Sequence, residues 1–185
     1  MLKRIIVASC FALVGYSVGA RAEIDKIMHF TDGAMHPEFR LKFSPPAKWT
    51  EDIAASKKNG LPIYVPAGTS FGSAPAVMYA RVTYNSDRQS MDKYVEVAHQ
   101  RWQAAELDVK IDPLANESRT NGSRPFRVYH FVNPSRPQQA YELMAYGEDK
   151  DKDGNNFFVM IGLSGATQDA IDKAEPSFRT ALRNH

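Results

Sequence analysis

The chain has 185 residues, with 23 Lys plus Arg, 21 Asp plus Glu and a single cysteine. Met1–Ala22 has the three parts of a secretory signal peptide: basic residues, an apolar stretch, and the small-x-small site Ala20-Arg21-Ala22. Cleavage there would remove Cys10 and leave 20 basic and 21 acidic residues. A nearly neutral chain without cysteine excludes disulfides, cysteine-bound metals and a thiol nucleophile. It also gives no reason to expect nucleic-acid binding, which needs clustered Lys and Arg.

The apolar stretch Ile5–Ala20 is too short for a membrane anchor. It has 16 residues, whereas a spanning helix needs roughly 20, so we expect no stable membrane span after cleavage. Val7-Ala8-Ser9-Cys10 offers a lipoprotein cleavage box as an alternative, but only a few apolar residues precede it. We therefore predict a periplasmic or secreted protein that begins at Glu23. Its length fits one domain, divided into an N-terminal arm at 23–37 and a globular α+β part at 38–185.

The first half of this chain alternates apolar and polar residues in short runs, which predicts strands. The predicted strands are 39–43, 49–53, 61–65 and 77–84. A polar loop is expected at 56–60 and a loop rich in Gly and Ser at 68–75. Ahead of them, Asp32-Gly33 predicts a turn within an arm that packs loosely.

Two helices and further strands are expected in the second half. Ser90 is a predicted N-cap of a helix that reaches about Leu107, because apolar residues recur there every three or four positions. The predicted strands are 109–111, 117–120, 126–132, 139–146 and 157–163, and Asn121-Gly122 predicts a hairpin between the second and third of them. Thr167 should cap a last helix, in which Pro176 either causes a kink or starts a second segment. This order predicts an α+β fold with a mostly antiparallel sheet flanked by helices.

A family resemblance rests on four segments of the chain. They are Phe39-x-x-x-Phe43-x-x-Pro46-x-x-Trp49, Tyr64-Val65-Pro66, the long helix after Ser90, and the closing Phe178-x-x-x-Leu182 helix. In this pattern the chain resembles the small PsbP-like α/β/α sandwich proteins, some of which are bacterial periplasmic proteins or lipoproteins. The resemblance covers roughly Phe39–Leu182 and implies a binding or assembly module without catalytic machinery.

Gly68-Thr69-Ser70-Phe71-Gly72 fits the G-x-S-x-G pattern of a nucleophile elbow, with Ser70 as the nucleophile. Such an elbow joins a strand to a helix, whereas Pro75 and a strand-like run follow here. His99 and His130 lie within a predicted helix and a predicted strand, away from the terminal loops where the base of a triad is expected. We therefore interpret 68–72 as an ordinary loop and expect no enzyme activity, with a serine hydrolase as the alternative.

Two groups of residues could bind metal. Asp149, Asp151, Asp153 and Asn155 reproduce the first half of a calcium loop, but the twelfth position is Met160 instead of a bidentate Glu. A soluble hairpin loop explains the same residues, and any calcium would bind weakly. His29, Asp32 and His36 could converge only if the arm ordered around an ion. We expect no metal and no cofactor.

Aromatic residues on both parities of strands such as 77–84 predict either two covered sheet faces or an exposed contact patch. The expected function is therefore a non-catalytic exported binding or assembly protein whose partner is another envelope protein. A small-molecule carrier with an apolar cavity is a further alternative, and it would need a concave site of roughly 300 Å³ or more.

Overall fold

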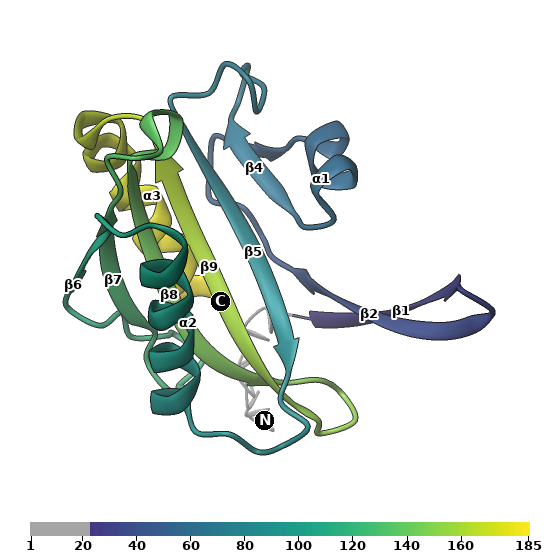
Figure 1. Cartoon of the computed structure of the whole chain (residues 1–185). Helices are drawn as coiled ribbons and strands as arrows, with labels where there is room; N and C mark the ends of the chain where they lie inside the picture. The colour runs from purple at the N-terminus through teal and green to yellow at the C-terminus, as the bar shows by residue number, and fades with distance from the viewer. Residues whose placement is uncertain (1–22) are drawn as a thin grey trace, which may run out of the picture.

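A seven-stranded antiparallel sheet forms the centre of the molecule, in the order β3-β4-β5-β9-β8-β7-β6 (Figure 1). The computed structural model describes residues 23–185, so the predicted signal peptide at 1–22 lies outside the described residues. The sheet strands are β3 (Trp49–Glu51), β4 (Ile63–Pro66), β5 (Ala76–Tyr84), β6 (Lys110–Pro113), β7 (Arg127–Val132), β8 (Tyr141–Lys150) and β9 (Asn156–Gly165). A separate two-stranded hairpin consists of β1 (Glu23–Thr31) and β2 (Ala34–Lys42). The helices are α1 (Ile53–Asn59), α2 (Met91–Ala105) and α3 (Gln168–Asn184), with a single 3-10 turn at Pro137–Gln139.

Helix α3 covers one face of this sheet, which we call the α3 face. Its N-cap is Thr167, whose side chain accepts a hydrogen bond from Ala170 N. Ile171, Phe178 and Leu182 are fully buried, because they recur on the side of the helix that meets the sheet. They join a core with alternate residues of β8 and β9, among them Leu143. The helix is continuous from 168 to 184 with Pro176 inside it, so Pro176 does not begin a second segment.

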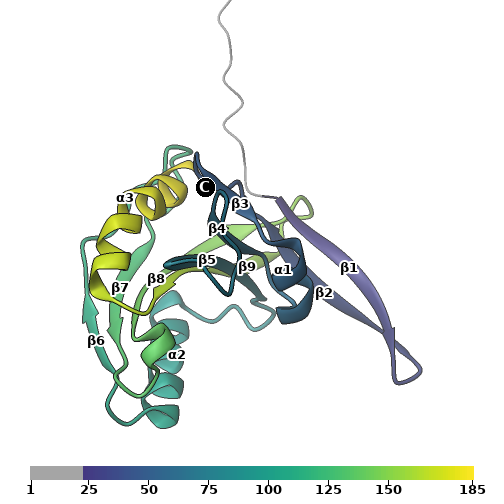
Figure 2. The same ribbon diagram turned by 90° about the horizontal axis from the view of Figure 1, so that it is seen from above.

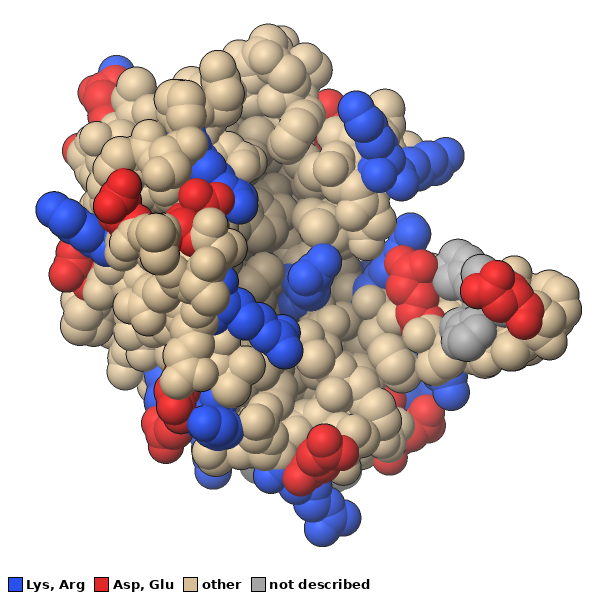
Figure 3. All heavy atoms as spheres, in the orientation of Figure 1, with Lys and Arg blue, Asp and Glu red and all other residues tan. Residues whose placement is uncertain are grey.

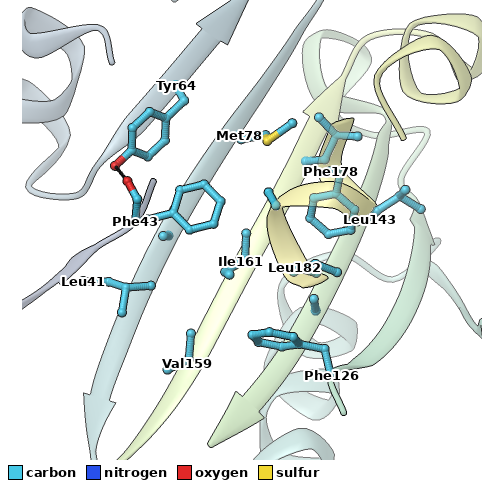
Figure 4. Close-up of a cluster of buried hydrophobic side chains, with 14 of the residues drawn as sticks. Leu41, Phe43, Tyr64, Met78, Phe126, Leu143, Val159, Ile161, Phe178 and Leu182 are labelled. Atoms are coloured by element: carbon cyan, nitrogen blue, oxygen red, sulfur yellow. Dashed lines mark hydrogen bonds between the residues drawn. The ribbon is translucent and has the colours of Figure 1, made fainter. Parts of the chain in front are cut away.

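The base of the β1–β2 hairpin completes the cover of the α3 face beside β5. Leu41 and Phe43 are buried in the same core as Phe178 (Figure 4). The hydroxyl of Tyr64 donates a hydrogen bond to the Phe43 carbonyl oxygen at 2.9 Å, shown as a dashed line. This bond satisfies a buried polar group and ties β4 to the chain that leaves the hairpin.

Helix α2 packs on the opposite face, which we call the α2 face. Ser90 is its N-cap and accepts a hydrogen bond from Lys93 N. Val95 and Trp102 pack against Phe131, Met144 and other residues of β7 and β8. Residues of one strand point alternately to the two faces, and because helices cover both faces, β8 is buried at both parities from Glu142 to Gly147. The predicted α+β class with helices flanking the sheet is therefore confirmed.

The predictions for 49–53 and 56–60 were partly wrong. Strand β3 ends at Glu51, and 53–59 form α1, which covers β4 on the α2 face. Asp52 caps this helix by accepting a hydrogen bond from Ala55 N at 3.0 Å, and Gly60 ends it with a positive φ of 68°. Both capping signals stand in the sequence, but the polar composition of 56–60 concealed them.

The predicted hairpin around Asn121-Gly122 was only partly right, since Gly122 lies in a turn but no strand ladder flanks it. β7 pairs with β6, and only an isolated bridge joins Glu117 to Phe126. Arg119 is buried, and the segment that follows it bonds to the end of α3: Thr120 N donates to the Arg183 carbonyl oxygen at 2.8 Å. These tertiary contacts replace the backbone hydrogen bonds that a strand at 117–120 would form with its neighbour. By contrast, the predicted hairpin between 139–146 and 157–163 is confirmed by the β8–β9 pairing, which closes at Lys150 and Asn156.

No helix within 23–185 combines the length and the apolar composition that a crossing of the membrane requires.

Candidate functional site

The β1–β2 hairpin forms an arm that extends away from the sheet (Figures 1 and 2). The prediction of a loosely packed arm at 23–37 missed its strands, which run on to Lys42. Asp32 and Gly33 form the predicted turn, and both have positive φ, 53° and 78°. Two such residues suit the twist of a two-residue hairpin.

One face of this arm is apolar apart from Lys26. Directly paired residues share a face, and the pairs on this face are Ile24–Leu41, Lys26–Phe39, Met28–Pro37 and Phe30–Met35. Ile24 and Leu41 are buried in the core, whereas Met28, Met35 and Phe30 toward the tip are 44%, 55% and 72% exposed. We call these three residues the arm tip. The apolar surface therefore starts inside the molecule and ends in solvent.

A groove runs along the α2 face between α2 and the C-terminal half of β5, with a cavity volume of about 320 Å³. It exists because α2 covers β7, β8 and, through Tyr94, Phe158 of β9, and α1 covers β4 and the start of β5, so the C-terminal half of β5 stays uncovered between them. Phe158, Met160 and Tyr146 form its floor, and Arg81 and Arg101 stand on its two walls. Figure 3 shows this hollow face, with basic side chains beside it. We call this cavity the α2 groove.

Tyr146 lies at the bottom of the α2 groove among other rings. It is 1% exposed, and the rings of Tyr94, His99 and Tyr129 surround it at centroid distances of about 6 Å. Within 23–185 its hydroxyl has no hydrogen-bond partner. Burial raises the pKa of this hydroxyl and lowers the pKa of His99, so both side chains are neutral at pH 7.

Ser70 does not sit in the setting of a nucleophile elbow. It lies in the exposed loop between β4 and β5, so no helix follows it. Its Oγ lies 3.0 Å from Ser73 Oγ, and no described imidazole is among its hydrogen-bond partners. The loop is held instead by Asp52, whose carboxylate accepts from Phe71 N at 2.9 Å.

The acidic loop between β8 and β9 uses its carboxylates for internal bonds. Asp151 accepts hydrogen bonds from the backbone N–H groups of Asp153 and Asn155, both at 2.9 Å, and from the Asn155 side chain at 2.8 Å. These bonds hold the pKa of Asp151 below its ordinary value. Asp149 pairs instead with Arg119 and His185. Among the described side chains, no three acidic, His or Cys groups converge to hold a metal.

Asp149 joins two basic groups at the end of the sheet. Its Oδ2 lies 2.7 Å from Arg119 Nη2 and 2.8 Å from His185 Nε2. The Arg119 side chain is completely buried, donates to the Glu148 carbonyl oxygen at 3.0 Å, and lies over the Phe126 ring. This network joins the 114–126 segment to α3 and the sheet. We interpret it as structural, because no groove opens onto the Arg119 side chain in the described structure.

The third group of candidate ligands is in the arm. His29 and His36 are directly opposite each other in the β1–β2 register, while Asp32 is in the turn. The imidazole groups of both histidines lie outside the described side chains, so a metal site there stays an untested alternative.

These features define the class of the protein as an α+β sandwich with an apolar arm and a polar-walled groove. No protein-family model matches the chain, and a search of curated proteins gives no match either. The sequence did not predict the residues of the α2 groove, because Arg81 and Arg101 belong to different elements and line the same cavity only in the folded protein. The sequence signal that indicates the strands of the arm is the alternation of apolar and polar residues that includes Met28 and Phe30.

Proposed function

We propose that this chain is a non-catalytic exported protein that binds another protein of the cell envelope through its arm. The observation that carries the proposal is the apolar face of β1–β2, which begins in the core and ends in three exposed large side chains. Contiguous exposed apolar surface marks interaction sites, and Met and Phe are enriched at the centres of interfaces. The resemblance to PsbP-like proteins implies the same type of binding module.

The chemistry of the arm indicates what kind of surface it fits. On its polar face, Arg40 pairs with Glu38 at 2.8 Å and Lys42 pairs with Asp25 at 3.1 Å. Because the charges of this face are paired within the hairpin, the arm offers an apolar area whose charged residue is Lys26, so its field is weak. The partner in this proposal therefore presents an apolar cleft wide enough for a two-stranded ribbon. Its affinity depends little on salt concentration.

Export is part of the proposal and has its own test. Cleavage after Ala22 would make Glu23 the first residue, so that β1 begins at the mature N-terminus. Intact-mass measurement of the exported fraction should give the mass of residues 23–185. Finding only the full-length precursor in the cytoplasm would contradict export.

The arm is tested by photo-crosslinking in cells that make the protein. A benzoylphenylalanine at position 30 should crosslink to one envelope protein of defined mass. The same probe at position 71, an exposed aromatic outside the arm, should give no such product. Phe30→Ser with Met35→Ser should abolish capture of that protein, while Leu107→Ser, which changes a leucine that is 92% exposed, should retain it.

Three results would contradict the proposal. They are the absence of any product specific to position 30, a product that joins two copies of this chain, and capture that survives the double substitution. Circular dichroism of each variant, together with its thermal midpoint, shows whether the sandwich remains folded.

A further inference from the structure

The α2 groove is a second surface whose chemistry differs from that of the arm. Its walls come from α2 and β5, and its floor from β8 and β9, so it is separate from the arm tip. A volume of about 320 Å³ lies at the small end of the range for sites that bind small molecules. The groove therefore accommodates a ligand much smaller than a protein segment.

Unpaired positive charge stands on both walls. Within residues 23–185, neither Arg81 nor Arg101 has an ion pair or a hydrogen bond. Asp87 is the one acidic residue among the described lining residues, and it accepts from Ser86 Oγ at 2.9 Å. A guanidinium group forms paired hydrogen bonds with carboxylate and phosphate-like oxygens. The walls therefore favour a ligand with an anionic head.

The floor is suited to an apolar body. Phe158 is buried, and the Tyr94 ring stacks on it with centroids 4.1 Å apart and planes at 14°. Met160 and Trp102 also line the groove. Flat rings and a thioether accept either an aromatic ring or a short acyl chain.

The Tyr146 hydroxyl is an independent sign of a ligand. It is buried at the floor of the groove and has no partner in the described chain. A buried hydroxyl without a partner is unfavourable, whereas an acidic head that enters between the rings around it would accept its hydrogen bond.

We propose that the α2 groove binds a small amphiphilic organic anion, whose acidic head lies between Arg81 and Arg101 and whose apolar body rests on Met160 and on the Tyr94 ring that covers Phe158. Such an anion could derive from a lipid or from an aromatic metabolite. Both share a carboxylate attached to an apolar body. The inference does not depend on the partner of the arm.

The test is calorimetric titration of residues 23–185 with decanoate and with 1-naphthoate. At least one should bind, and the stronger of the two assigns the acyl or the aromatic source. Arg81→Gln and Arg101→Gln should each weaken binding about tenfold, the usual effect of losing one charge-assisted bond. Arg124→Gln is the matched control, because Arg124 is exposed, pairs with Glu148 and lies outside the groove. It should leave the affinity unchanged.

Tyr146→Phe separates a binding role from a structural one. It should weaken binding several-fold and leave the thermal midpoint of the free protein unchanged or higher, because it removes an unpaired polar group. The proposal is overturned if neither anion binds at millimolar concentration, or if 1-naphthylmethylamine binds as well as 1-naphthoate. It is also overturned if the protein is a dimer whose groove binds the anions only after Phe30→Ser, since a second copy would then be the occupant.

Discussion

The Tyr79 hydroxyl lies 3.3 Å from Oε2 of Glu142, although β5 and β8 are separated by β9. Its oxygen is also 3.2 Å from Met144 Sδ. The ring reaches across β9 because Gly162 stands between: a Cβ at that position would lie 2.3 Å from the Tyr79 ring. Glycine here is required for a close approach, and it lets a tyrosine of one strand bond a carboxylate two strands away.

Glu142 predicts a pH dependence of stability. Its burial raises its pKa from 4.5 to about 7, against the hydrogen bond from Tyr79 and the charge of Arg136. Between these values the folded protein holds a proton that the unfolded chain has lost, so the free energy of unfolding falls as the pH rises. The loss is on the order of 3 kcal/mol across this window.

Glu142→Gln should remove this fall, because glutamine stays neutral and nearly isosteric. Urea unfolding at pH 5 and pH 8 measures it: the variant should gain stability relative to the wild type as the pH rises. His99, whose pKa is lowered by burial, acts in the opposite direction below its unfolded value and is common to both proteins. If the free energy of unfolding changes with pH in the same way in both proteins, Glu142 is ionised in the folded state.

Gly162→Ala should destabilise the protein by about 1–3 kcal/mol, the cost of forcing a methyl group into a filled core. In a Tyr79→Ala background the same change should cost much less, since the ring that it meets is gone. Gly72→Ala is the control, because a Cβ there meets nothing within 4 Å. Equal costs in both backgrounds would contradict the contact.

Asp149→Asn should destabilise the protein by about 3 kcal/mol, because it leaves the completely buried Arg119 without its counter-charge. Glu148→Gln should cost less than 1 kcal/mol, since its partner Arg124 is 84% exposed. The pair Arg119→Met with Asp149→Leu should recover much of the loss. Urea unfolding compares the variants, and a neutral Asp149→Asn would contradict a buried ion pair.

Calcium and chelator should leave the thermal midpoint unchanged. Asp149 is already paired with Arg119 and His185, and Asp151 caps the loop with its own backbone, so little carboxylate remains for an ion. The measurement is thermal unfolding with EDTA and with millimolar calcium, in the wild type and in Asp151→Asn. A rise with calcium that the substitution removes would establish a calcium site.

Ser70→Ala should not change any ester hydrolysis that the protein shows. The Ser70 hydroxyl is exposed and bonds Ser73 in a loop that leads into a strand, so nothing in its described surroundings raises its nucleophilicity. Release of p-nitrophenol from the acetate ester measures the rate. A turnover that disappears in the variant would restore the serine hydrolase.

Local signals in the sequence determined the caps at Ser90 and Thr167, the β8–β9 hairpin and the α+β class. Each follows from a few neighbouring residues: a hydroxyl before a periodic helix, or two apolar runs around a polar turn. The alternation of apolar and polar residues in the arm was a weaker signal than these, because Lys26 and Pro37 interrupt the series of large apolar side chains on one face.

Only the tertiary structure decided which distant residues meet. Arg119 is buried against Asp149 and Phe126 and does not form part of a strand. This burial requires that β8 and the 114–126 segment pack together, which the sequence around Arg119 does not predict. Arg81 and Arg101 face one groove because α2 covers β7 and β8 and leaves the C-terminal half of β5 open. Contacts of this kind depend on how the helices are placed on the sheet. The propensity of a residue reflects only its near neighbours in the sequence, so it cannot predict a contact between residues twenty or more positions apart.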